Sequence, residues 1–373
     1  MKRVLITEDD ALIAAIYRDS FEKEGFSAEV ASDGAVAIQR LKGNPPDVVV
    51  LDLMLPNVNG VEVLKFIRSQ QKLEALPVIV MSNAFAGELG REATAAGATK
   101  IFAKNACGPK RLMKEVRELL AGAAFTPSEI AVSSDTAIIM RDFRKEVTIA
   151  MPVRVAAVRR LAEGLAGDHS NPERLLAMQR AVHQLTGIVS LAGLNGTAHL
   201  AGALDAMMKE LHSQPQTMTS SSLRTIVESL RILDSLSSRG TLHLDNGIPS
   251  PLILVVDDDS VSRAEACAAL EQAHLRALAV GDPQLALKLA TDNQFNLLLA
   301  DVGMPEMNGF ELVKKFHATS RNADTPVIFV AALDEFEAQA GPASRSSLNF
   351  IPKPILPPEL AVRALTELLR DSA

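Results

Sequence analysis

The chain carries one ordered set of acids, turn residues and a lysine twice. In the first copy the set is Asp9, Asp52, Pro56, Gly60, Pro77 and Lys104, and in the second it is Asp258, Asp301, Pro305, Gly309, Pro326 and Lys353. Every member lies 249 positions from its counterpart, as 258 minus 9 shows. A histidine, His183, lies between the two copies. Carboxylates on both sides of a histidine point to phosphoryl groups that move between aspartate and histidine.

The acids of each copy are expected to gather at one edge of a sheet. Glu8 and Asp9 directly follow an apolar run, and Asp52 follows another. In open parallel sheets, ligands bind at the carboxyl ends of the strands. Three clustered carboxylates repel one another without a cation, and Mg²⁺ prefers such oxygen ligands while it reaches out to phosphate. Ser82 and Lys104 follow further apolar runs and supply a hydroxyl and an ammonium for phosphoryl oxygens.

Short runs rich in Val and Ile predict strands that are buried on both faces. The runs are Val4–Thr7, Val48–Leu51 and Val78–Met81 in the first copy, and Leu252–Val256, Leu297–Ala300 and Pro326–Val330 in the second. Helical patterns such as Ala11–Glu24 and Gly60–Ser69 lie between them. This alternation predicts a parallel sheet with helices on both sides in each copy.

The segment between the copies lacks this alternation, and its pattern predicts helices without strands. We expect them at Arg141–Ala166, Pro172–Ala192, Gly196–His212 and Ser221–Ser238. Short connections make an antiparallel four-helix bundle the natural arrangement. The expected domains are residues 1–122, 135–238 and 251–373, with linkers at 123–134 and 239–250.

Composition narrows the class of protein. The 373 residues suffice for two or three domains, and a hydrophobic content of 47% allows each a core. A net charge of −7 argues against a nucleic-acid partner. The two cysteines, Cys107 and Cys267, form no disulfide framework, which fits a reducing cytoplasm. We recognise no signal peptide and no run of 18 uncharged apolar residues, so we expect no membrane insertion.

The motifs around the acids resemble the signature regions of response-regulator receiver domains. In the first copy they read Ile-Thr-Glu-Asp-Asp, Leu-Asp-Leu-Met-Leu-Pro-Asn-Val-Asn-Gly, Val-Met-Ser-Asn-Ala and Phe-Ala-Lys. In the second they include Val-Val-Asp-Asp-Asp and Ala-Asp-Val-Gly-Met-Pro-Glu-Met-Asn-Gly. The resemblance covers Met1–Gly122 and Pro251–Ala373 and implies two doubly wound (βα)5, flavodoxin-like domains.

For the first copy, the resemblance implies that Asp52 is the phosphoacceptor. Glu8, Asp9 and Asp52 would bind Mg²⁺ together with the backbone carbonyl of Met54. Ser82 would be the switch hydroxyl.

Three further positions bear on the first copy. Lys104 would contact the phosphoryl group. Asn105 replaces the usual proline, which leaves the cis peptide of the family in question. Ile101 stands where the family has an aromatic switch residue.

For the second copy, the resemblance implies that Asp301 is the acceptor. Asp257, Asp258 and Asp301 would bind Mg²⁺ with the backbone carbonyl of Gly303.

The contact and switch positions of the second copy differ from those of the first. Lys353 would contact the phosphoryl group, and Phe350 occupies the aromatic switch position. Ala331 stands where the first copy has Ser82, so the usual hydroxyl-driven switch is weakened.

His183 lies in a helical pattern whose core stripe is formed by four apolar residues, Met178, Val182, Leu185 and Val189. At about 100° per residue His183 points roughly 120° away from the centre of that stripe, so we expect it to be accessible to solvent. Gly187 is one turn later on the same side and allows close approach of a partner. Arg180 can help to hold a phosphoryl group.

The motif His183-Gln-Leu-Thr186-Gly187 resembles that of histidine-containing phosphotransfer domains, which are four-helix bundles. The resemblance covers about Asp135–Ser238 and implies that His183 is a phosphoacceptor. Thr186 replaces the usual lysine of the family.

These observations predict a cytoplasmic, bacterial phosphorelay protein with a receiver, a phosphotransfer and a receiver domain in that order. A sensor histidine kinase would phosphorylate Asp52, and the group would pass to His183 and then to Asp301 or another protein. Other receiver or phosphotransfer proteins are alternative partners. We recognise no ATP-binding kinase domain, so the chain would relay phosphoryl groups rather than act as a multiple-turnover enzyme.

A second interpretation stays open. Phosphorylation of Asp52 would change domain packing and so control binding of another protein. His183 would then be idle, and Ala331 would mark the second receiver as a docking domain.

Overall fold

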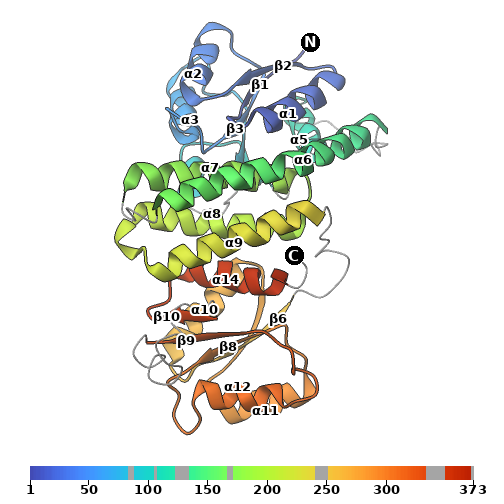
Figure 1. Ribbon diagram of the computed structural model, residues 1–373. Coiled ribbons are helices and arrows are strands. Elements are labelled where there is room, and N and C mark those ends of the chain that lie inside the picture. Colours follow the sequence, from blue (N-terminus) through green and yellow to red (C-terminus); the bar gives the residue numbers. More distant parts are fainter. Residues whose placement is uncertain are drawn as a thin grey trace. The chain divides into compact units, whose positions relative to one another are not determined.

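The computed structural model of the chain contains two five-stranded parallel sheets and a helical region between them in sequence (Figure 1). It describes residues 1–82, 88–104, 107–121, 134–165, 171–239, 251–332 and 349–370. The chain divides into two compact units, residues 1–151 with 183–194, and residues 152–182 with 195–373.

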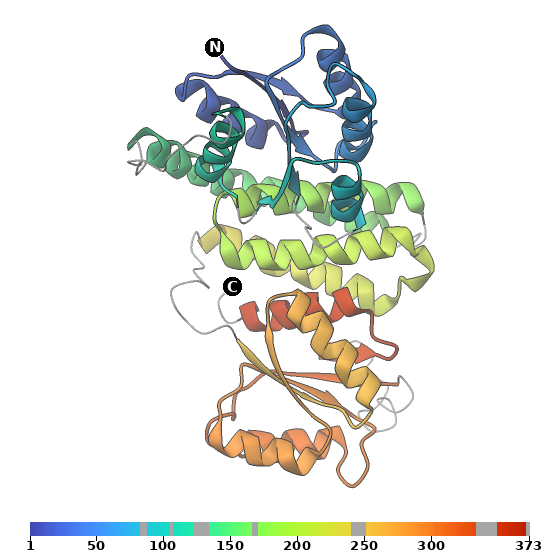
Figure 2. The ribbon, with the colours of Figure 1, turned by 180° about the vertical axis from the view of Figure 1, so that it is seen from behind.

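The first α/β domain lies within residues 1–121. Its strands are β1 (Arg3–Thr7), β2 (Ser27–Ala31), β3 (Val48–Asp52), β4 (Val78–Ser82) and β5 (Lys100–Ala103). They are parallel and lie in the order β2-β1-β3-β4-β5. The helices are α1 (Ala11–Lys23), α2 (Gly34–Gly43), α3 (Gly60–Ser69), α4 (Glu88–Ala95) and α5 (Pro109–Ala121). Helix α1 contacts α5 on one face of the sheet, and α3 contacts α2 and α4 on the other (Figure 2).

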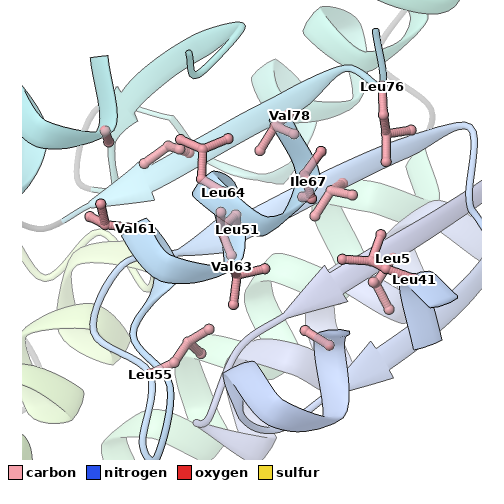
Figure 3. Packing of buried hydrophobic residues seen from close by; sticks show 14 of the residues in the cluster. Leu5, Leu41, Leu51, Leu55, Val61, Val63, Leu64, Ile67, Leu76 and Val78 are labelled. Atoms are coloured by element: carbon pink, nitrogen blue, oxygen red, sulfur yellow. The ribbon is translucent and has the colours of Figure 1, made fainter. Parts of the chain in front are cut away.

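The core of this domain explains why its strands read as continuous apolar runs. All five residues of β3 are buried, because helices cover both faces of a parallel sheet. Leu51 of β3 lies near Leu64 and Ile67 of α3, and Leu5 of β1 lies beside Leu41 of α2 in the same cluster (Figure 3). The predicted alternation of strands and helices is confirmed.

The second α/β domain lies within residues 252–370 and repeats this winding. Its strands are β6 (Leu252–Val256), β7 (Arg276–Val280), β8 (Leu297–Asp301), β9 (Val327–Ala331) and β10 (Phe350–Pro352). Their order is β7-β6-β8-β9-β10, all parallel. Helices α10 (Ser260–Gln272) and α14 (Pro357–Arg370) contact each other, as do α11 (Pro283–Asp292) and α12 (Gly309–His317). Both predicted flavodoxin-like domains are therefore confirmed.

The region between the sheets contains four long helices, as expected. They are α6 (Ser134–Leu165), α7 (Pro172–Leu191), α8 (Asn195–Ser213) and α9 (Ser220–Arg239), with a short 3₁₀ turn η2 (Pro215–Thr217). Helix α6 begins before the expected Arg141 and has Pro152 in its interior. The predicted linkers fall almost entirely outside the described residues. No described helix combines the length and hydropathy that crossing a membrane requires.

Helix α14 is buried along nearly its whole length, because it belongs to two packing layers. It contacts α10 of its own domain and also α8 and α9. The Glu359 carboxylate accepts hydrogen bonds from the hydroxyls of Ser221, Ser222 and Thr225 at 2.6, 2.9 and 3.0 Å. These hydroxyls lie in the first turns of α9, where the helix dipole favours a negative charge. Arg363 Nε donates to Thr225 Oγ1 at 2.6 Å and completes a buried polar network.

A left-handed residue recurs in the loop after the third strand of each domain. Asn57 has φ 62° and Glu306, its counterpart 249 positions later, has φ 64°. Asparagine tolerates this conformation because its side chain bonds locally, whereas glutamate does not. The second domain therefore carries backbone strain that the first relieves.

Glu306→Asn is expected to stabilise the second domain by about 1 kcal/mol, since a left-handed residue other than Gly or Asn costs roughly that much. Hydrogen exchange of β8 across a urea series measures the urea concentration at which half of the second domain is unfolded. This midpoint should rise. The reciprocal change Asn57→Glu should lower the midpoint of the first domain. Tyr17 is the single tyrosine of the chain and is buried in α1, so its fluorescence reports that domain alone. A lower midpoint for Glu306→Asn would contradict the prediction.

Candidate functional site

Three carboxylates meet at the carboxyl ends of β1 and β3, as the sequence predicted. Glu8 and Asp9 follow β1, and Asp52 is the last residue of β3. One oxygen from each of the three lies within 4.8 Å of the others. Glu8 and Asp52 are buried and Asp9 is half-buried. We call these residues the first acidic cluster.

A buried lysine supplies positive charge to the first acidic cluster. Lys104 Nζ donates to Glu8 Oε2 at 2.8 Å and to Asp52 Oδ2 at 2.7 Å, and its side chain is 2% exposed. Burial alone would lower the pKa of Lys104, but the charges of Asp52 and Glu8 raise it well above its usual range. The lysine therefore stays protonated in the interior.

The two buried carboxyls of this cluster differ in their electrostatics. Burial raises the pKa of Glu8 to about 8, although the Lys104 charge opposes the shift. Burial also acts upward on the pKa of Asp52. The charges of Lys104 and His183 and a hydrogen bond from Lys104 outweigh it, so the pKa of Asp52 lies below its usual range. Asp52 is thus held in its ionised form, which is the nucleophilic form of a carboxyl group.

Backbone packing fixes the position of Asp52. The Met54 N–H donates to Asp52 Oδ1 at 3.2 Å. A Cβ at Gly60 would lie 2.1 Å from the Asp52 carbonyl oxygen, so only glycine fits at the start of α3. Gly309 stands in the same relation to Asp301, at 2.3 Å. The repeated glycines are therefore required by the close approach of a helix to the strand that ends in Asp52 or Asp301.

The third acid of each motif has a separate task. Asp10 accepts hydrogen bonds from the backbone N–H groups of Leu12 and Ile13 and so caps α1. Asp259 caps α10 through the N–H of Ser262. In each run of three acids the first two face the cluster and the third begins the helix.

The second acidic cluster consists of Asp257, Asp258 and Asp301, with one oxygen of each within 4.8 Å of the others. Lys353 Nζ lies 3.1 Å from Asp257 Oδ2 and 3.1 Å from Asp301 Oδ1. Its side chain is 26% exposed, against 2% for Lys104. Burial raises the pKa of Asp257, and the neighbouring Asp301 adds to the shift. The second cluster is therefore the more open of the two.

The switch positions of the second domain are packed with apolar side chains. Ala331 and Phe350 are fully buried and belong to one hydrophobic cluster with Val302. Phe329 stacks on Phe310 at 4.5 Å between ring centroids in the same cluster. The Lys353–Pro354 peptide is cis. A methyl group thus fills the position at which the first domain has Ser82.

His183 is buried, which overturns the predicted accessibility. The residue is only 6% exposed, while the core stripe of α7 is buried as predicted. The next residue, Gln184, donates from Nε2 to Asp9 Oδ2 at 2.7 Å. The charge of His183 acts on Asp52 and on Asp9. The face of α7 opposite its stripe is therefore covered by the first acidic cluster rather than by solvent.

The neighbours of His183 divide between buried and exposed positions. Thr186 and Gly187 are buried, whereas Arg180 is exposed. The structure thus brings Gly187 and His183 to a covered region of α7 and leaves Arg180 at the surface.

Some predicted site residues lie partly or wholly outside the described part of the chain. Ser82 ends β4, beside Ala103, and its side chain is not among those described. Asn105 lies outside the described residues. Met54 and Gly303, whose backbone carbonyls were predicted to complete the Mg²⁺ ligands, follow Asp52 and Asp301 by two positions. Gln184 was not predicted, because only its position beside His183 marks it in the sequence.

Both acidic clusters have the donor chemistry that Mg²⁺ requires. Each offers three carboxylates whose oxygens converge, and such hard ligands suit this ion. In the second cluster Asp301 Oδ1 is buried and lies 3.1 Å from Lys353 Nζ, so the lysine supplies positive charge to this oxygen.

Comparison with known families agrees with this geometry. Residues 4–117 and 253–365 match the family described as response regulator receiver domain, and together they make up more than half of the chain. The chain belongs to this family, which supports a role in two-component signalling.

Curated relatives share single domains with the chain. The response regulator MprA of Mycobacterium sp. (strain KMS) is 38% identical over 80 residues, which are 21% of this chain and 34% of MprA. The polar-differentiation response regulator DivK of Brucella ovis is 28% identical over 122 residues, which are 33% of this chain and 98% of DivK. The chain thus spans about a third of MprA and nearly all of DivK.

Solved structures similar to part of the chain include two single-domain receivers. The receiver domain of the Francisella response regulator 1452 has 30% identity and a TM-score of 0.30, and the match covers 32% of this chain and 98% of that one. The chemotaxis response regulator CheY4 of Vibrio cholerae has 27% identity and a TM-score of 0.31, with coverage of 32% and 99%.

Lys104→Met is expected to destabilise the first domain by about 3 kcal/mol, because it leaves buried carboxylates without their counter-charge. Lys353→Met, the matched change in the more open cluster, should cost the second domain about 1 kcal/mol or less. Tyr17 fluorescence in urea measures the first change, and hydrogen exchange of β8 the second. Added Mg²⁺ should raise the midpoint of Lys104→Met more than that of the unchanged chain, since the cation replaces the lost charge. Equal losses in both variants would contradict the prediction.

Proposed function

We propose that this chain is a phosphorelay protein in which Asp52 accepts a phosphoryl group and exchanges it with His183. The observation that supports this most is the 2.7 Å hydrogen bond from Gln184, the neighbour of His183, to Asp9 of the first acidic cluster. His183 also lies close enough to lower the pKa of Asp52. A histidine and an ionised aspartate at one acidic cluster are the two acceptors that such an exchange needs.

The first acidic cluster would hold the cofactor of the exchange. Glu8, Asp9 and Asp52 would bind Mg²⁺ together with the Met54 carbonyl. Bound Mg²⁺ neutralises charge that develops on the phosphoryl oxygens. Lys104, held beside Asp52 at 2.7 Å, would contact a phosphoryl oxygen, and Ser82 at the end of β4 would act as the switch hydroxyl.

The exchange requires one bond to form and one to break. A nitrogen lone pair of the His183 imidazole attacks the phosphorus carried by Asp52, and the bond between phosphorus and the Asp52 oxygen breaks. The electron pair returns to the Asp52 carboxylate, and the ring proton of the phosphorylated imidazole is released to solvent. Lys104 stays protonated and stabilises the carboxylate on both sides of the step. The reverse reaction returns the group to Asp52.

The other parts of the chain have supporting roles in this exchange. The helical segment 135–238 serves as the phosphotransfer domain between receivers at 1–122 and 251–373, with Arg180 and Gly187 in supporting roles. A sensor histidine kinase or a phosphotransfer protein supplies the phosphoryl group. Asp301 is a second acceptor.

The second acceptor has its own ligands and contacts. Asp257, Asp258 and the Gly303 carbonyl would hold Mg²⁺ with Asp301. Lys353 contacts the phosphoryl group, and Phe350 occupies the aromatic switch position, buried against Ala331.

Labelling of the full chain tests the exchange. Acetyl phosphate with a radioactive phosphoryl group and Mg²⁺ should place label both in a hydroxylamine-sensitive acyl phosphate and in a base-stable, acid-labile phosphohistidine. His183→Gln should remove the base-stable label and keep the acyl phosphate. Asp52→Asn should remove most of both. His212→Gln, a change of another helical histidine, serves as the control and should alter neither.

Base-stable label that persists in His183→Gln would contradict the assignment of His183. Acyl phosphate that persists undiminished in Asp52→Asn would contradict the assignment of Asp52.

A second candidate function is supported by the packing of the second domain. Helix α14 contacts α8 and α9 through the buried Glu359 network, and Phe350 is already buried against Ala331. A domain held in this way suits a scaffold that binds another protein under control of Asp52. In that case the chain would carry acyl phosphate without phosphohistidine, so the labelling experiment separates the two functions.

A further inference from the structure

Gln184 joins helix α7 to the first acidic cluster. Its Nε2 donates to Asp9 Oδ2 at 2.7 Å, across 175 positions of sequence. Asp9 contributes one oxygen to the cluster with Glu8 and Asp52. A carboxylate has two oxygens, so a bond to one of them leaves the other for a cation. Gln184 can therefore contact this carboxylate without displacing a metal ion.

The environment of Asp9 makes this contact effective. Asp9 is half-buried, so the bond is screened less than one at an exposed surface. An amide N–H that donates to a carboxylate forms a charge-assisted bond, which is stronger than a bond between neutral groups. Burial raises the pKa of Asp9, and the hydrogen bond from Gln184 opposes this rise without cancelling it.

The second domain differs at the corresponding position. Asp258, the counterpart of Asp9, is exposed. Among the described residues, no hydrogen bond or ion pair from a helix reaches the Asp258 carboxylate. The contact made by Gln184 therefore distinguishes the two acidic clusters, although each consists of three carboxylates beside a lysine.

We propose that Gln184 is a positioning residue, which holds α7 at the first acidic cluster through Asp9 and so makes Asp52 of the same chain the preferred partner of His183. The inference rests on the proposed exchange between Asp52 and His183. Gln184 itself takes no part in bond formation. The adjacent residue, His183, is close enough to lower the pKa of Asp52. The bond from Gln184 to Asp9 fixes the helix in the position that keeps His183 near Asp52.

The charge at position 184 should control the contact. Glutamate would place a carboxylate against that of Asp9 and repel it, and alanine would remove the donor. Lysine would restore attraction through an ion pair of similar reach. Gln214 is a matched control, because it is an exposed glutamine whose Nε2 donates to Glu210 of its own helical segment.

The first measurement is hydrogen exchange of the full chain, without phosphoryl donor and without Mg²⁺. Gln184→Ala and Gln184→Glu should accelerate exchange in segments 183–194 and 8–13 together, while Gln184→Lys and Gln214→Ala leave both protected. Unchanged protection in the Ala and Glu variants would overturn the role of Gln184, whatever the result of labelling.

The second measurement follows transfer within and between chains. His183 is phosphorylated with phosphoramidate, and the label then moves with Mg²⁺ to Asp52 of the same chain or of a second full chain that carries His183→Gln. The unchanged protein should transfer within the chain at a rate independent of concentration. Gln184→Ala should slow this step about tenfold, the usual effect of losing a bond to a charged group, and raise the share that passes between chains.

The two measurements separate the inference from the function on which it rests. If Gln184→Ala slows transfer within and between chains equally, Gln184 does not select the partner and the inference is wrong. If the unchanged chain never transfers label, the proposed function is wrong, and the hydrogen-exchange result alone decides whether Gln184 holds the helix.

Discussion

Carboxylates that converge at the end of a parallel sheet require positive charge, and both α/β domains are organised around this requirement. Lys104 supplies the charge from within the first acidic cluster, where Glu8 and Asp52 lie 2.8 and 2.7 Å from its Nζ. Lys353 supplies it in the second from a more exposed position. The ends of the strands, the loops after them and the glycines beside Asp52 and Asp301 all help to bring these charges together. A cation suits a site of this kind because it relieves repulsion between carboxylates that the fold itself brings together.

The loops around the clusters show how closely local sequence and tertiary contact are linked. In each run of three acids the third caps a helix, so the first two are held at the end of the strand. Gly60 and Gly309 allow a helix to begin against the backbone carbonyls of Asp52 and Asp301. The two domains then diverge at a few side chains, chiefly where the second has Ala331 and Glu306.

Local pattern was sufficient for much of the fold and of the clusters. Runs such as Val48–Leu51 showed the buried strands, and the constant offset of 249 showed that both domains share one winding. The accessibility of His183 was predicted wrongly, because helical periodicity identifies the face that packs in the helix's own core and says nothing of a distant segment on the other face. Gln184 was missed for the same reason, since its partner Asp9 is 175 positions away. The double burial of α14 depends on hydroxyls in α9 that no repeat marks.

Helix α14 packs against α10 of its own domain and, through the Glu359 network, also against α9. A helix that completes a receiver fold also closes the first turns of α9 through Ser221, Ser222 and Thr225. The match to the receiver family covers residues 253–365. A domain swap at those bounds would break the contacts between α14 and α9, so the unit that can be exchanged intact is larger than the receiver fold. A foreign receiver joined after residue 250 would leave three hydroxyls and a helix terminus without their carboxylate.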